Sequence, residues 1–246
     1  FQLNNGQASH SVAAWNGTAW DVLNGGVQGG GSVNGVFGMD IDSAGRVYIS
    51  GDFSRSTADE TPLNNVAVYS EAGLWQPLGS GLGNSSSQIV NSVITIGTDA
   101  YFGGVFADAN GSPNRKKNFA RWNPEIDFRD YVPNQDAPPI AGEPSGPVFE
   151  DRYFYLDYGG PSTDPFELVK QGDFIYMVGG FLSTDGNDNM KNMARFHLLR
   201  EKWETVPGID WRHANFIRTL FADNEGNLWV GGDFNSIGGV AASKVA

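Results

Sequence analysis

A short phrase built around glycine and phenylalanine recurs along the chain and constrains its fold more than any other feature. Each copy begins with an aromatic residue, continues through one or two glycines and ends with phenylalanine. The copies are Tyr48–Phe53, Tyr101–Phe106, Tyr176–Phe181 and Trp229–Phe234, and Phe1 fits as the end of a fifth. A repeat of about 52 residues is typical of architectures in which each repeat forms one supersecondary unit.

Each repeat contains four apolar segments that indicate strands. In the first complete repeat we predict strands at Val36–Ile41, Val47–Phe53, Asn65–Tyr69 and Leu74–Leu78. Segments of this kind are rich in β-branched and aromatic residues, lie between turn-forming residues and lack helical periodicity. Four short antiparallel strands per repeat describe one blade of a β-propeller. The sequence therefore predicts an all-β propeller with four visible periods, complete or part of a larger one. A β-sandwich and an open β-solenoid are the alternatives.

The closing phenylalanines are the predicted core markers of the repeat. An aromatic side chain at a fixed place in every blade can fill the space between neighbouring blades. We expect Phe53, Phe106 and Phe181 to be buried at equivalent positions, and the complete set of markers is Phe1, Phe53, Phe106, Phe181 and Phe234.

One segment, residues 123–165, is longer than the corresponding part of the other repeats and rich in proline. Proline at this density disfavours both helix and central strand. Aromatic residues such as Tyr153, Phe154 and Tyr155 argue against a disordered linker. We expect a single propeller domain over residues 1–246, or an excerpt of one, with this insertion as a contact surface.

The two terminal stretches are equivalent parts of the repeat. Phe1–Ala13 and Phe234–Ala246 each run from the closing phenylalanine into the third predicted strand. A closed propeller needs this stretch only once, and an unpaired strand edge is a template for another chain. We therefore expect either an excerpt of a longer repeat protein or a terminal strand that completes a neighbouring subunit.

Composition limits the partners and the compartment. The net charge is −12 and the isoelectric point is near 4.5, so nucleic acid is an unfavourable partner. No apolar run is long enough for a transmembrane helix, and the chain contains no cysteine. The chain begins with Phe and shows no signal peptide, which indicates a processed product or an excerpt. Predicted turns hold three candidate N-glycosylation sites, at Asn16, Asn84 and Asn110, the last weakened by Pro113.

The ionisable residues give little support for catalysis or metal binding. Inner-strand carboxylates could converge on a propeller channel, and the candidates are Asp40, Asp42, Glu167 and Asp223. We interpret Asp42 and Asp223 as hairpin-turn residues, and Asp40 and Glu167 as strand residues that face solvent. The three histidines, at positions 10, 197 and 213, lack metal-ligand spacing. We expect no catalytic site, no metal and no cofactor.

Tryptophan could supply sugar-stacking platforms, but six of the seven tryptophans recur at strand positions. We expect these six to be buried between blades; they are Trp15, Trp20, Trp75, Trp122, Trp203 and Trp229. Trp211 lies outside the pattern and is the candidate exposed ligand contact.

The motifs resemble cell-surface β-propeller repeats of bacterial surface proteins and of the fungal cortical polarity-marker family. Those repeats combine an aromatic-x-Gly-Gly-x-Phe phrase, a Gly-Gly turn and an Ile/Val-Ala-x-Trp strand. The matching positions here are Trp229–Phe234 with Gly238-Gly239, Val12–Trp15 with Trp20, and Trp75 with Leu78–Gly81. The similarity covers most of the chain apart from residues 123–165. Asp223–Trp229 also resembles, more loosely, kelch and two-component-sensor propellers.

This resemblance implies a non-enzymatic scaffold at the cell surface or outside the cell. It would have a structural or adhesive role, or act as a scaffold for protein–protein interaction. Assembly into a filament is one such role. Protein partners or further copies of the chain are the expected ligands, and glycans are a further class. The alternative is a lectin-like propeller or, with less support, one that cleaves glycans. Because propellers carry many unrelated activities, the fold alone does not choose between these functions.

Overall fold

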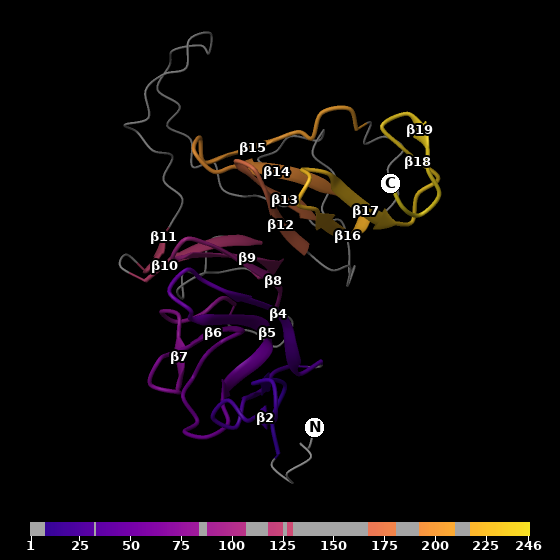
Figure 1. Cartoon of the computed structure of the whole chain (residues 1–246). Helices are drawn as coiled ribbons and strands as arrows, with labels where there is room; N and C mark the ends of the chain where they lie inside the picture. The colour runs from indigo at the N-terminus through magenta and orange to yellow at the C-terminus, as the bar shows by residue number, and fades with distance from the viewer. Residues whose placement is uncertain are drawn as a thin grey trace. The chain divides into compact units, whose positions relative to one another are not determined.

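The structure is a computed structural model, and it describes residues 8–31, 33–83, 88–106, 118–124, 127–129, 167–180, 192–209 and 217–246. The chain divides into two compact units, Phe1–Arg129 and Asp130–Ala246. The described residues form nineteen strands and no helix, and every strand pair is antiparallel (Figure 1). No helix in the described part of the chain could therefore cross a membrane.

The first unit contains the first complete four-stranded repeat. Its strands pair in chain order and are β4 (Gly35–Ile41), β5 (Val47–Ser56), β6 (Val66–Tyr69) and β7 (Trp75–Pro77). The four predicted segments thus form the four expected strands. An additional strand, β3 (Val27–Gly29), pairs with the far end of β5 and was not expected.

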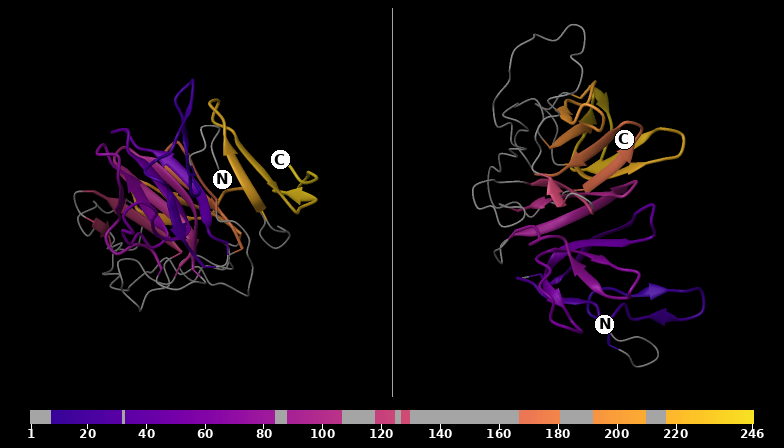
Figure 2. Two further views of the ribbon diagram at one scale, coloured as in Figure 1. Left: turned by 90° about the horizontal axis from the view of Figure 1, so that it is seen from below. Right: turned by 90° about the vertical axis from the view of Figure 1, so that its left-hand side faces the viewer.

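The second repeat follows in the same unit and has the same order. Its strands are β8 (Ile89–Ile96), β9 (Asp99–Val105), β10 (Phe119–Asn123) and β11 (Asp127–Arg129). β4 and β5 both lie against β8, so the sheets of the two repeats are stacked neighbours (Figure 2). An incomplete repeat precedes them as a two-stranded hairpin, β1 (Ala14–Trp15) and β2 (Trp20–Asp21), which occupy third-strand and outer-strand positions.

The second unit repeats this plan. One four-stranded sheet consists of β12 (Glu167–Gln171), β13 (Phe174–Val178), β14 (Met193–His197) and β15 (Lys202–Glu204). The last repeat has β16 (Ile217–Ala222) and β17 (Leu228–Gly232), and a small hairpin, β18 (Ser236–Ile237) and β19 (Val240–Ala241), follows. Residues 244–246 return along the edge of β17, with Gly231 bridged to Val245.

The core lies between stacked sheets. Phe53, Phe106 and Phe234, which close three copies of the phrase, are all at most 2% exposed. Phe1 and Phe181 lie outside the described residues. Between the first two repeats, Tyr48 from β5 packs with Val93 and Phe102 from β8 and β9. Each such aromatic side chain buries a large apolar area, so this layer contributes to the stability of the first unit.

A left-handed backbone conformation before four of the third-strand segments was missed in the sequence. Ser11, Asn65, Asn192 and Lys244 all have left-handed backbone, with φ of 69°, 69°, 62° and 74°. Asparagine tolerates this conformation better than most residues. The Asn65 side chain also donates to the carbonyl of Leu82, 2.9 Å away, and so ties its blade to the connection that follows. At two of these positions, the asparagine before Val66-Ala67 and before Met193-Ala194 was the available signal.

The all-β, repeated architecture is therefore as predicted. A closed ring and a single domain over residues 1–246 stay predictions.

Candidate interaction surfaces

Neighbouring inner strands are joined by carboxylates. Asp40 on β4 accepts hydrogen bonds from the backbone N–H of Thr95 on β8, at 2.6 Å, and from the Thr95 hydroxyl, at 3.0 Å. In the second unit Glu167 on β12 accepts from the backbone N–H of Leu220 on β16, at 2.7 Å. Asp40 and Glu167 are half-buried, and each satisfies a donor on the next inner strand.

The two turn carboxylates stabilise hairpins. Asp42 accepts from the backbone N–H groups of Ala44 and Arg46, and its other oxygen is 2.6 Å from an Arg46 guanidinium nitrogen. Asp223 accepts in the same way from Glu225 and Asn227. These bonds agree with the interpretation of both residues as turn formers.

The Asp223 carboxylate has a further partner in the indole of Trp229. Trp229 Nε1 donates to it at 3.0 Å, and Asn227 Nδ2 donates at 2.9 Å. These bonds, the indole first, lower the pKa of Asp223 to about 2. Trp229 is held in position on β17 by this bond while its ring stays exposed.

Two blade faces carry exposed apolar side chains. On β4, Met39 is 49% exposed and Ile41 59%, although the equivalent of Met39 on β8, Val93, is 4% exposed. In the last repeat, Phe221 and Trp229 lie directly opposite each other on β16 and β17, and both are exposed. We call these the β4 face (Met39, Ile41) and the β17 face (Phe221, Trp229).

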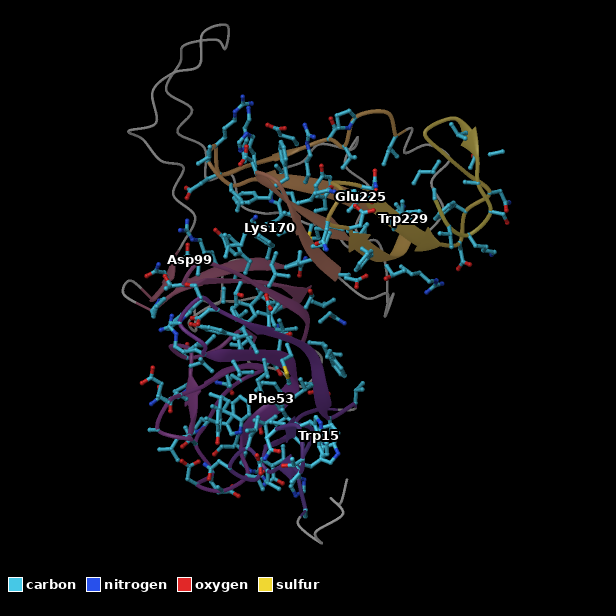
Figure 3. The ribbon with its side chains drawn as sticks, in the orientation of Figure 1. Trp15, Phe53, Asp99, Lys170, Glu225 and Trp229 are labelled. Carbon is cyan, nitrogen blue, oxygen red and sulfur yellow. The ribbon has the colours of Figure 1, made fainter. Side chains whose placement is uncertain are left out.

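A third exposed apolar surface is the aromatic pair of the β1–β2 hairpin. Trp15 and Trp20 are cross-strand partners with ring centroids 5.5 Å apart, and both are exposed. Figure 3 shows Trp15 at the edge of its unit, whereas Phe53 lies among the strands. Two polar side chains adjoin the pair: Asn16 Nδ2 donates to the Asp21 carboxylate at 2.9 Å.

The same cross-strand aromatic pair is buried or half-buried in complete repeats. Tyr69 and Trp75 have centroids 4.9 Å apart, and Phe196 and Trp203 are 5.4 Å apart. Trp75 is almost fully buried, and its Nε1 donates to the carbonyl of Leu23 in the preceding repeat, at 2.8 Å. The expectation of burial is thus wrong for three of the six recurring tryptophans, Trp15, Trp20 and Trp229.

The remaining sequence-predicted sites are only partly described. Asn16 is exposed in the tight connection between β1 and β2, where its Oδ1 accepts from Thr18. Asn84, Asn110 and Trp211 lie outside the described residues. His10 is exposed, and the His197 ring packs edge-on against Phe174. Within the described ranges, no three His, Asp or Glu side chains cluster as metal ligands would.

One family model matches the chain. Residues 213–234, which include β16 and β17, match the two component regulator propeller repeat. No curated protein matches the chain. The match, together with the all-β repeats, supports a resemblance to β-propeller repeats and a β-propeller kind of interaction or scaffold protein.

Proposed function

We propose that the chain is a non-enzymatic β-propeller scaffold that binds protein partners at the cell surface or outside the cell. The observation that carries this proposal is the exposure of aromatic side chains at repeat positions, above all Trp15 and Trp20. Exposed aromatic residues are enriched where proteins bind other proteins. The likeness of the motifs to cell-surface propeller repeats supports the location.

A non-catalytic role is supported by the hydrogen bonds that the four candidate carboxylates accept. Asp40 and Glu167 accept hydrogen bonds from the next inner strand, and Asp42 and Asp223 accept them within their own hairpins. Each of these four carboxylates thus has a structural role as a hydrogen-bond acceptor.

Partner retention tests the scaffold proposal. The chain is coupled to beads and incubated with the surface and secreted protein fraction of its source cells. The parent is compared with Trp15→Ser/Trp20→Ser and with a control, Leu199→Ser, which changes an exposed residue outside the aromatic pair. We expect the double variant to lose proteins that the parent and the control both retain. Equal retention by all three chains would contradict the proposal.

Carbohydrate binding is the second candidate function. The Trp15–Trp20 pair offers an apolar stacking surface, and Asn16 and Asp21 beside it offer hydrogen-bonding groups. Sugar sites combine these two features because pyranose rings present both an apolar face and hydroxyl groups. A glycan array probed with the parent and with Trp20→Ser distinguishes the two functions: glycans bound by the parent alone would favour a lectin.

Glycosylation of Asn16 tests the location. If the protein passes through a eukaryotic secretory pathway, Asn16 is a candidate acceptor because it lies exposed in a turn, although its Nδ2 donates to Asp21 in the folded chain. Peptide mass spectra of native material should then show a glycan at Asn16. Unmodified Asn16, Asn84 and Asn110 would remove the eukaryotic version of this proposal.

A further inference from the structure

A β-bulge recurs at the same place on the inner strands of three repeats. The pairing of inner and second strand takes in one extra residue at Phe37 on β4, at Asn91 on β8 and at Arg218 on β16. Bulges redirect a side chain and are frequent beside functional sites. We propose that the neighbouring bulge residues Phe37 and Asn91 bind an extended peptide segment of a protein partner. The proposal rests on the scaffold function and names the surface and the chemical class of its ligand.

The glycine that recurs in the repeated phrase is required by the bulge. Gly51 and Gly104 each lie opposite the residue that precedes the bulge. A Cβ at Gly51 would clash with the carbonyl oxygen of Gly35, and a Cβ at Gly104 would clash with that of Ile89. Glycine inside a strand is otherwise unfavourable and marks such close approaches. The bulge is therefore part of the repeat, whereas the residue that it presents differs from one repeat to the next.

The bulge residues stay accessible where a preceding repeat is present. β4 and β5 lie against β8 in the first unit, and β12 and β13 lie against β16 in the second (Figure 1). Asn91 is nonetheless only half-buried, and the Arg218 side chain is 47% exposed. Phe37, in the first complete repeat, is 40% exposed. Accessibility at this position is thus a property of the bulge and does not require an uncovered sheet face.

Phe37 and Asn91 are neighbours at one end of the first unit's inner strands. The residues that follow them, Gly38 and Ser92, are in contact, because a Cβ at Gly38 would lie 3.0 Å from the Ser92 Cα. At this end β5 runs into the long connection of residues 57–65, whereas the tight turn of residues 42–46 closes the other end. Long connections on a rigid scaffold commonly carry binding residues. The pair therefore lies at the end of the sheets that suits recognition.

Aspartates hold two of the bulge regions in place. Asp52 is 2% exposed, and its carboxylate accepts from the backbone N–H groups of Val33, at 2.9 Å, and Asn34, at 3.0 Å, just before β4. Asp233, at the same place in its phrase, instead accepts from the Arg218 guanidinium at 2.8 Å. Groups that are fixed before binding lose less conformational entropy when a partner arrives. The fold thus prepares these bulges for a ligand.

The chemistry of the two side chains fits a peptide. Within the described residues, the Asn91 side-chain amide makes no hydrogen bond and the Phe37 ring has no aromatic partner. A side-chain amide both donates and accepts, so it can pair with the N–H and C=O groups of an extended main chain. Aromatic residues are enriched at protein interfaces, where they contact apolar side chains. The expected ligand is therefore an extended segment that carries an apolar residue.

Peptide selection tests the proposal. A phage-displayed library of random peptides is selected on the immobilised parent chain, and the enriched peptides are synthesised and titrated against parent and variants. We expect Phe37→Ala and Asn91→Ala each to weaken binding about tenfold, as removal of a strong interface contact does. The matched control is Ile41→Ala, which shortens an exposed apolar residue at the other end of β4 and should bind within about twofold of the parent. No enriched peptide, or equal affinity for all four chains, would overturn the proposal.

A conservative variant tests the role of the amide. Asn91→Asp keeps the size of the side chain and its acceptors but, at neutral pH, removes the donor. We expect it to weaken peptide binding as much as Asn91→Ala does, while denaturant unfolding shows the stability of the parent for both. Parent-like binding by Asn91→Asp would contradict the amide pairing.

A glycan array distinguishes the other class of ligand. Glycans that bind the parent and are lost in Phe37→Ala would assign the surface to a sugar and overturn the peptide proposal. Failure of the peptide tests is also distinguishable from failure of the scaffold function. Proteins retained by the parent and lost with Trp15→Ser/Trp20→Ser would leave that function standing.

Discussion

The joint between the first two repeats and the uncovered face of β4 are built from equivalent residues in opposite environments. Val93 and Met39 occupy the same register position on consecutive inner strands. Val93 is buried beneath Tyr48 of the preceding repeat, whereas Met39 is half exposed. The difference teaches that burial in this fold is decided by the neighbouring blade. A residue's own place in the repeat does not settle it.

Phenylalanine truncation should give the largest effect on the buried side of this comparison. Phe53→Ala and Phe106→Ala each remove a fully buried ring, and we expect a loss of about 3–5 kcal/mol in the free energy of unfolding. Denaturant unfolding measures it. The control is Phe37→Ala, whose ring is partly exposed on β4. Parent-like stability in Phe53→Ala and Phe106→Ala would refute the role of these residues as repeat core.

Shortening Val93 and Met39 tests the comparison directly. Val93→Ala should cost about 1–2 kcal/mol, because it removes two methyl groups from a packed layer. Met39→Ala should change stability by less than about 0.5 kcal/mol in the monomer, as exposed substitutions usually do. Unfolding is followed at low protein concentration, so that contacts between copies do not contribute. Equal losses would show that Met39 is covered in solution.

The smallest expected effect is on the pH dependence of stability, through the bond between Asp223 and Trp229 on the exposed β17 face. The pKa of Asp223 is lowered from 3.8 to about 2 by donors present only in the folded hairpin. Its contribution to stability is therefore present above pH 3.8 and is lost as the pH falls through about 2. Asp223→Asn should flatten the fall of the melting temperature over that range. Melting temperatures that fall equally steeply with pH in both proteins would show that this hairpin does not limit unfolding.

Much of the fold could be predicted because each strand is indicated by its own residues and by the turn residues beside it. The segment Val36–Ile41 was expected from its apolar residues and forms β4, which begins one residue earlier at Gly35. The turns Asp42–Gly45 and Asp223–Gly226 were expected from residues that favour them, and Asp42 and Asp223 accept the hydrogen bonds that such turns need.

The surfaces were harder to predict because they depend on residues distant in the sequence. Trp20 and Trp75 hold the same repeat position, and the indole of Trp75 donates to the carbonyl of Leu23 in the preceding repeat, a contact between residues 52 positions apart. The pairing of β3 with β5 likewise depends on the long extension of β5 to Ser56, which the repeat pattern does not contain. The left-handed asparagines were visible in the sequence, but their meaning required the backbone angles.

The hydrogen bond that the backbone N–H of Leu220 donates to the Glu167 carboxylate joins two repeats without using a side chain of the second. Every amino acid except proline provides that donor. The bond therefore does not depend on which side chain stands at position 220, although the Leu220 side chain itself is buried in the core of its unit. A joint to a backbone donor keeps its geometry when the side chain at that position changes.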